Sequence, residues 1–239
     1  MKETYYVGAY WLSRQENLEV CAQRAELFLR LLAACDRSFA HWFEKGWTLE
    51  EALKHPIAPE KAKLLEAFRR QEEQPSELGV CLDLWNGEPP EDASSLSFAG
   101  GRTSPWVSNL CVLNLPEGGP AAERMLQAPV LAQLLRAMAL AWEPECGVAL
   151  SHEHRAKVSE APKAGTFLGW VSYFSHRRGP VPSLPPPVHV EPVGDKGTLI
   201  ILTPERFTAS NPAHLELALN VTETLSQAGL LGPLRPWDG

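Results

Sequence analysis

The chain has 239 residues, a formal net charge of −7 and 44% apolar residues, which is typical of a globular protein that builds its own core. The negative charge argues against nucleic acid as a direct ligand, because phosphate binding needs a basic patch. No apolar run approaches the roughly 18 residues that cross a bilayer, and no secretory signal pattern opens the chain, so we expect a cytoplasmic protein.

The first third of the chain predicts one strand and three helices. A Ser or Thr followed three residues later by Glu forms a capping box, and Ser13 with Glu16 and Thr48 with Glu51 fit this pattern. Pro59 suits the first turn of a further helix. β-Branched and aromatic residues are typical of a strand. These signals predict a strand at residues 4–11 and helices at residues 13–35, 48–54 and 59–68.

Strands dominate the rest of the chain, with two more helices. Pro129 opens an apolar helical stripe that ends near Trp142, and Asn211 with Pro212 caps a final helix that should stop at Gly229. The last two predicted strands flank a Gly-Asp-Lys-Gly turn, which is consistent with a hairpin. Strands are predicted at residues 78–84, 96–99, 106–115, 147–152, 166–175, 188–193 and 198–203.

Strands and helices do not alternate regularly, so a doubly wound parallel sheet is not expected. We predict an α+β fold with a mixed, largely antiparallel sheet, or sheets, covered by helices. Residues 1–239 are predicted to form a single domain. Both halves begin with mixed helix and strand, which leaves open two lobes that share a core.

His152 and His154 are the best candidates for a catalytic or metal-binding pair. On a strand they would point the same way, as in some metal sites, and would support a metal-dependent hydrolase. No third ligand stands at a diagnostic spacing, so a polar strand end is the favoured interpretation. The five cysteines are scattered without any CxxC and are expected to be structural thiols. We therefore predict no enzyme activity, no metal and no cofactor.

Acidic residues concentrate in one stretch of the chain. Between Glu66 and Asp92 there are eight acidic residues against two arginines, a local charge of −6. Acidic surfaces steer basic partners, although a solvated helix end and loop would carry the same charges. Eight tryptophans could add exposed anchors. These features favour protein binding over catalysis.

Several blocks of the sequence resemble the immunity protein 52 family. The blocks occur in the expected order along nearly the whole chain. They are YYVGAYW (5–11) with the helical Cys-Ala-x-Arg of residues 21–24, GWVSYFS (169–175) followed by LPPP (184–187), and NPAHLELA with LSQAGLL inside residues 211–231.

The resemblance implies an α+β antidote from a bacterial polymorphic toxin system. Its partner would be a toxin made alongside it, usually a nuclease of restriction-endonuclease-like fold that is often delivered by a type VI secretion system. Neutralisation would take place in the cytoplasm. The family brings no catalytic residues. A nuclease presents a basic surface to phosphate, which an acidic protein can occupy.

We predict that the toxin docks on the acidic stretch and blocks DNA access or distorts the catalytic centre. An alternative interface centres on Trp170, Tyr173 and His176. The competing function is the hydrolase built on His152 and His154. The predicted toxin-binding residues are Glu72, Glu73, Glu77, Trp85, Glu88, Glu91 and Asp92.

Overall fold

The computed structural model describes residues 3–46, 48–70, 79–104, 107–158 and 163–234. Its strands are β1 (Tyr5–Trp11), β2 (Trp42–Glu44), β3 (Pro56–Ile57), β4 (Val80–Trp85), β5 (Ser95–Gly100), β6 (Asn109–Asn114), β7 (Cys146–Ser151), β8 (Val171–Ser175), β9 (His189–Val193) and β10 (Gly197–Ile201). Its helices are α1 (Leu18–Cys35), α2 (Leu49–Ala52), α3 (Lys61–Arg69), α4 (Gly119–Met125), α5 (Ala128–Trp142), α6 (His152–Val158) and α7 (Pro212–Gln227), with 3-10 turns η1 (Arg37–Phe39) and η3 (His176–Arg178).

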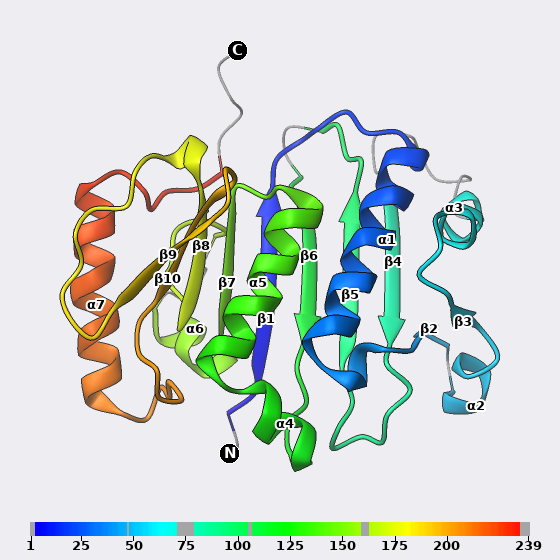
Figure 1. The fold of residues 1–239 in the computed structure, drawn as a ribbon, viewed down its shortest axis with the longest axis horizontal. Helices are drawn as coiled ribbons and strands as arrows, with labels where there is room; N and C mark the ends of the chain where they lie inside the picture. The colour runs from blue at the N-terminus through cyan, green and yellow to red at the C-terminus, as the bar shows by residue number, and fades with distance from the viewer. Residues whose placement is uncertain (1–2, 47, 71–78, 105–106, 159–162, 235–239) are drawn as a thin grey trace.

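All of these strands join one sheet in the order β3-β2-β4-β5-β6-β1-β7-β8-β10-β9, and every pairing is antiparallel. The predicted α+β class with a largely antiparallel sheet is confirmed. β1 lies between the strands of the first half and those of the second half (Figure 1). The two halves of the chain therefore meet along the first strand.

β1 shows how alternation divides the sheet into two faces. Tyr5, Val7, Ala9 and Trp11 all join the main core, whereas Tyr6 belongs to a second cluster on the opposite face. The second face also carries the glycine and the last tyrosine of YYVGAYW. A Cβ on that glycine would lie 2.5 Å from the tyrosine hydroxyl oxygen. Glycine therefore gives the tyrosine ring room to lie flat on the sheet.

Three helices, α1, α3 and α5, cover one face of the sheet (Figure 1). Trp142, at the end of α5, lies at the centre of an aromatic cluster in this layer. Its ring centroid is 4.3 Å from that of Phe98, 5.6 Å from that of Phe28 and 5.9 Å from that of Trp11. This cluster joins α1 and α5 to β1 and β5 in one core.

No single helix among the described residues is long and apolar enough to cross a membrane. α4 and α5 together pass that test by length and composition, but they are bent by 78° relative to each other. Ten of the 15 residues of α5 are buried in the protein, as expected for a core helix.

Local capping signals are partly confirmed. Thr48 caps α2, since its hydroxyl accepts from the backbone N–H of Glu51 at 3.2 Å. The prediction that Ser13 starts the first long helix is wrong: Asn17 is the cap, and its side chain accepts from Val20 N–H at 2.9 Å. Glu16, the expected box partner, instead binds two arginines.

Proline and asparagine signals had the same mixed outcome. Asn211 caps α7 with Pro212 in its first turn, as predicted, and Gly229 adopts a positive φ just past the end of the helix. Pro59 lies before the cap residue Glu60 rather than in the first turn of α3. Helix α4 was not predicted.

Candidate functional site

Trp85 is the last residue of β4 and is partly exposed on the face of the sheet opposite α1, α3 and α5. Its ring centroid lies 6.1 Å from that of Phe43 on the neighbouring strand β2. Gly87, with φ of +77°, makes this packing possible, because a Cβ there would lie 2.6 Å from the Phe43 ring. The two rings form an aromatic corner at the end of β4.

The loop after β4 is held in shape by the buried side chain of Asn86. Its amide oxygen accepts from the N–H groups of Ser94 at 2.9 Å and Glu88 at 3.4 Å. Its amide nitrogen donates to the carbonyl oxygens of Ser38 at 3.3 Å and Asp92 at 3.4 Å. A ring of backbone contacts around one amide orders the loop without salt bridges.

Asp92 has a structural contact within this loop. Its carboxylate accepts from the backbone N–H of Ala121 at 3.0 Å, in the first turn of α4. A negative charge is stabilised at that end of a helix. Arg124, further along α4, pairs with Asp36 after α1 at 3.0 Å. Burial would raise the pKa of Asp36, but hydrogen bonds from Arg124 and Ser38 outweigh it and lower the pKa.

The remaining acidic groups of these two loops lie at the surface. Glu91 and Glu117 are exposed, and Glu88 is partly exposed. The loop of Glu117 joins the first loop through a hydrogen bond from Gly118 N–H to the Glu91 carbonyl oxygen at 3.3 Å. We call Glu88, Glu91 and Glu117 the acidic margin. The sequence does not indicate that Glu117 lies near Glu91, because β5 and β6 separate the two residues along the chain.

Three predicted site residues, Glu72, Glu73 and Glu77, lie outside the described residues. Of the predicted surface, the structure therefore brings together Trp85, Glu88, Glu91 and Asp92. It also adds two residues that the sequence did not single out, Phe43 and Glu117.

The alternative interface consists mostly of core residues. Trp170 is buried, and its indole N–H donates to the Thr203 carbonyl oxygen at 2.8 Å. Tyr173 is buried too, and its hydroxyl donates to the Lys196 carbonyl oxygen at 3.0 Å, while burial raises its pKa. Only His176, in η3, is exposed. A partner could reach that histidine but not the two aromatic rings.

The predicted strand end at His152 and His154 is wrong. β7 ends at Ser151, whose hydroxyl accepts from His154 N–H at 3.1 Å and turns the chain into α6. Two residues apart on a helix, the side chains diverge by about 200°. His152 is exposed, whereas His154 is buried against Phe207 at a ring distance of 4.7 Å. Within the described ranges, no cluster of three His, Cys, Asp or Glu side chains could hold a metal ion.

Four of the five cysteines have a thiol whose pKa is raised by burial: that of Cys111 lies well above its usual value, those of Cys21 and Cys146 are about 12, and that of Cys35 is about 11. The fifth, Cys81, is partly exposed, and its sulfur accepts from Arg102 at 3.7 Å. Because the thiolate is the reactive form, the four thiols with a raised pKa are protonated and unreactive at neutral pH.

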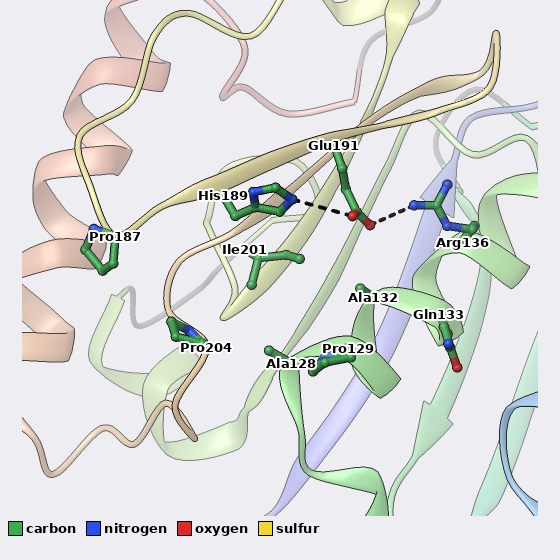
Figure 2. A pocket seen from close by; sticks show the side chains of 10 residues that line it. All are labelled: Ala128, Pro129, Ala132, Gln133, Arg136, Pro187, His189, Glu191, Ile201 and Pro204. Carbon is green, nitrogen blue, oxygen red and sulfur yellow. Dashed lines mark hydrogen bonds and ion pairs between the residues drawn. The ribbon is translucent and has the colours of Figure 1, made fainter.

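A cleft of about 530 Å³ opens between α5 and the edge strand β9. Figure 2 shows Arg136 reaching from α5 to Glu191 on β9 at 2.7 Å, with His189 on the other side of that carboxylate at 3.7 Å. Arg136 also donates to the Pro192 carbonyl oxygen at 2.9 Å. Alanines, prolines and Ile201 form most of the lining of the cleft, and none of the residues that line it is Ser, Thr or Cys. The polar groups fasten the edge strand to the helix and offer no nucleophile.

The acidic margin thus gathers three acidic side chains from two loops beside the aromatic corner of Trp85 and Phe43. The family model described as Immunity protein 52 matches residues 3–234, nearly the whole chain. This chain belongs to the Immunity protein 52 family. The resemblance expected from the sequence is confirmed.

A solved structure resembles this Immunity protein 52 member along most of its length. It is the Pseudomonas aeruginosa T6SS protein PA0821, with 15% sequence identity and a TM-score of 0.55. The match covers 93% of this chain and 73% of that one. At this identity the likeness shows a shared fold. No curated protein matches the sequence.

Proposed function

We propose that this protein is an antidote that binds and neutralises a cognate bacterial toxin in the cytoplasm of the cell that makes both. The toxin would be a nuclease of restriction-endonuclease-like fold delivered by a type VI secretion system. The protein would act by occupying the active or DNA-binding surface of the toxin, with no cofactor and no catalysis of its own.

The observation that carries this proposal is the match to an immunity protein family over residues 3–234. The similar protein from Pseudomonas aeruginosa is named a T6SS protein, which supports the delivery route. The net charge of −7 suits a basic partner, because a nuclease must attract phosphate. The divergent side chains of His152 and His154 weigh against the hydrolase alternative.

Co-expression with the adjacent gene tests the antidote role. The toxin gene alone should kill a bacterial host, and co-expression with this chain should restore colony counts and yield a complex in a pulldown. Killing that persists without any complex would reject the proposal for that gene pair. If the toxin alone degrades the host chromosome and co-expression of this chain keeps the chromosome intact, the toxin is a nuclease. If the toxin alone kills the host without degrading its DNA, the nuclease part of the proposal is rejected.

We place the toxin contact at the acidic margin and Trp85. Charge reversal of Glu88, Glu91 and Glu117 to lysine should slow association by about tenfold or more, and should weaken its dependence on salt, because complementary charge mainly sets the association rate. Asp92 stays unchanged in this variant. Its carboxylate caps α4, so its loss would confuse folding with binding.

The matched control reverses three exposed acids at the other end of the sheet and carries the same change in net charge. Its association rate should stay within about threefold of the wild-type rate, because long-range steering depends on where the charges lie. Equal slowing by both triple variants would mean that net charge alone matters and would refute this placement. The control substitutions are Glu205→Lys, Glu216→Lys and Glu223→Lys, all at exposed positions.

A further inference from the structure

One row of residues crosses the second face of the sheet from β4 to β10. The pairing register places Asp83, Ser97, Val112, Gly8, Val148, Ser172 and Ile200 side by side in this row. Neighbours in a row share one face of the sheet. The exposure of the side chains in this row therefore shows which parts of that face are covered.

Coverage changes abruptly along the row. On β7, β8 and β10 the side chains of Val148, Ser172 and Ile200 are buried. On β4 Asp83 is exposed, and on β5 and β6 Ser97 and Val112 are partly exposed. The covered part lies near α6, which follows the end of β7 (Figure 1), and Arg155 of α6 lies over the rings of Tyr6 and Phe167 on this face. None of the described helices covers the part formed by β4, β5 and β6, which we call the open face.

The open face combines polar and apolar groups. The Asp83 carboxylate accepts from the Ser97 hydroxyl at 2.6 Å and keeps acceptor capacity for a partner. Trp85 and Phe43 lie at one end of the same strand, and Val112 packs against the second core cluster. A surface with aromatic corners, one carboxylate and hydroxyl groups is suited to protein recognition.

The charges along this face favour a basic partner. Asp83 adds to the acidic margin, which begins in the loop directly after β4. Two cations at the edges are engaged within the protein. Arg102 donates to the Ser108 carbonyl oxygen at 3.1 Å, and Arg155 lies over the Tyr6 ring at 5.8 Å. A third cation, Lys45, is exposed directly after β2, and its backbone N–H donates to the Asp83 carbonyl oxygen at 3.1 Å. The acidic groups Asp83, Glu88, Glu91 and Glu117 outnumber this exposed lysine.

Size connects the open face to the acidic margin. Three strands about 4.8 Å apart and six residues long cover roughly 300 Å² in projection. A standard interface buries about 800 Å² on each partner. A partner seated on this platform must therefore extend over the neighbouring loops, which brings it to Glu88 and Glu91.

We infer that the open face of β4, β5 and β6 is the platform on which the toxin docks, with the acidic margin as its rim. This rests on the proposed function. The toxin would place a cationic or hydrogen-bond-donating side chain at Asp83 and an apolar side chain beside Trp85 and Phe43.

Two substitutions on the platform test the inference by titration with the purified toxin. Val112→Arg puts a long charged side chain on the open face and should weaken binding by at least about 30-fold, as at the centre of an interface. Asp83→Asn keeps the shape and should weaken binding by about fivefold or more. This milder variant keeps the test valid if the arginine variant fails to fold. Circular dichroism and melting temperature verify folding.

Two matched controls lie far from the platform. Leu219→Arg on α7, where the leucine is 67% exposed, and Glu216→Gln should bind the toxin like the wild-type protein. A third variant tests a rival surface, the groove between α1 and α5, where Leu27 is 44% exposed. Leu27→Arg should also leave affinity unchanged.

Four outcomes contradict the inference. If the platform variants bind like wild type, the platform is not the interface. If Leu27→Arg alone weakens binding, the groove between α1 and α5 is the interface. If Val112→Arg disrupts a dimer of this chain without changing toxin affinity, a second copy occupies the platform. If the wild-type protein itself fails to bind, the proposed function falls, and the inference with it.

Discussion

His154 contributes an apolar stacking surface rather than a reactive group. Its ring stacks on Phe207 at 4.7 Å, and Phe207 stacks in turn on His214 of α7 at 5.0 Å. Nδ1 of His154 has no hydrogen-bond partner among the described residues. Burial disfavours its charged form and lowers the pKa of His154 to about 4. The imidazole is therefore neutral in the folded protein at neutral pH.

This pKa predicts a specific loss of stability in mild acid. The unfolded chain binds the proton with a pKa near 6.5, so between pH 6.5 and pH 4 it binds more protons than the folded protein. The free energy of unfolding should be at its full value above pH 6.5 and fall by up to roughly 3 kcal/mol as the pH drops to 4. Denaturant unfolding at several pH values measures this.

The control for that experiment is its neighbour on the same helix. His154→Gln should flatten the slope between pH 6.5 and 4, whereas His152→Gln, at an exposed position, should keep it. Identical slopes in the wild-type protein and His154→Gln would show that this histidine does not set the acid response.

Glu143 ends α5 with a positive φ of 47° and ties the helix end to two other elements. Its carboxylate accepts from Lys196 Nζ at 2.6 Å and from Arg24 at 3.0 Å. The hydrogen bond from Lys196 is the largest cause that lowers the pKa of Glu143 to about 2, and Arg24 adds to it. The folded protein thus holds the charged form more tightly than the unfolded chain does.

The lowered pKa of Glu143 affects the free energy of unfolding at a lower pH than that of His154 does. Stability from the contact is fully present above the unfolded pKa of about 4.5 and is lost as the pH falls towards 2. Glu143→Gln should therefore lower the free energy of unfolding at pH 7 by about 1 kcal/mol or less, because the group is partly exposed and solvent screens the pair. It should also reduce the slope below pH 4.5. Asp195→Asn, 3.9 Å from the same lysine, should change neither, and an equal effect would contradict this assignment.

The spacing of His152 and His154 in the sequence could not decide whether their side chains lie on the same face. Two residues apart, they share a face only if the backbone is extended, and the secondary structure changes at Ser151 just before them. The sequence does carry a sign of that change, since a serine followed by charged residues is typical of a helix start. The absence of a third ligand at a diagnostic spacing was the more informative feature.

At the scale of elements, Arg136 adds polar contacts to the apolar packing between the β9–β10 hairpin and α5. Arg136 bridges the helix to Glu191 and to the Pro192 carbonyl oxygen on the edge strand (Figure 2). Pro192 itself removes a backbone donor, which protects a sheet edge from pairing with other chains. Pro192 thus limits pairing at the outer edge of the hairpin, and Arg136 holds the hairpin against α5.

Arg136→Met tests the clamp while keeping the apolar stem. The variant should lose about 1 kcal/mol of stability, since a partly exposed ion pair and one hydrogen bond disappear. Hydrogen exchange should accelerate in β9 and β10 and remain unchanged in β4 and β5. Uniform acceleration across the sheet would show that the contact stabilises the whole fold instead of the hairpin.

Elements with local signals were predictable from the sequence. Alternation identified β4, and the Asn-Pro cap with a terminal glycine identified α7. Helix α4 was missed because its first turn is capped by Asp92 from a distant loop. A partner so far away in the chain leaves no capping signal beside the helix.

At the scale of the whole molecule, the order of strands could not be derived from the chain. β1 pairs with β6 and β7, which follow it by about a hundred residues or more, and no local pattern encodes such a pairing. The difference between the covered and open parts of the second face does have a signal. All residues of β7 and β8 are buried, while β4 and β6 alternate, and strands buried on both faces read as continuous runs of apolar and small residues.

The two ends of the second face of the sheet differ in how far they are covered. One end of the second face is covered within the chain, whereas the other end presents Asp83 and Trp85 beside acidic loops. A protein that works by binding needs such a surface, held rigid before the partner arrives. The ordered Asn86 loop and the α4 contacts provide that rigidity at the margin.

The most direct test of the antidote role is a titration of the purified toxin with the purified wild-type chain, with nuclease activity as the readout. We predict that DNA cleavage falls as the chain is added and is abolished at saturation, while the platform variants inhibit only at higher concentrations. Full cleavage in the presence of a large excess of folded wild-type chain would contradict the antidote role.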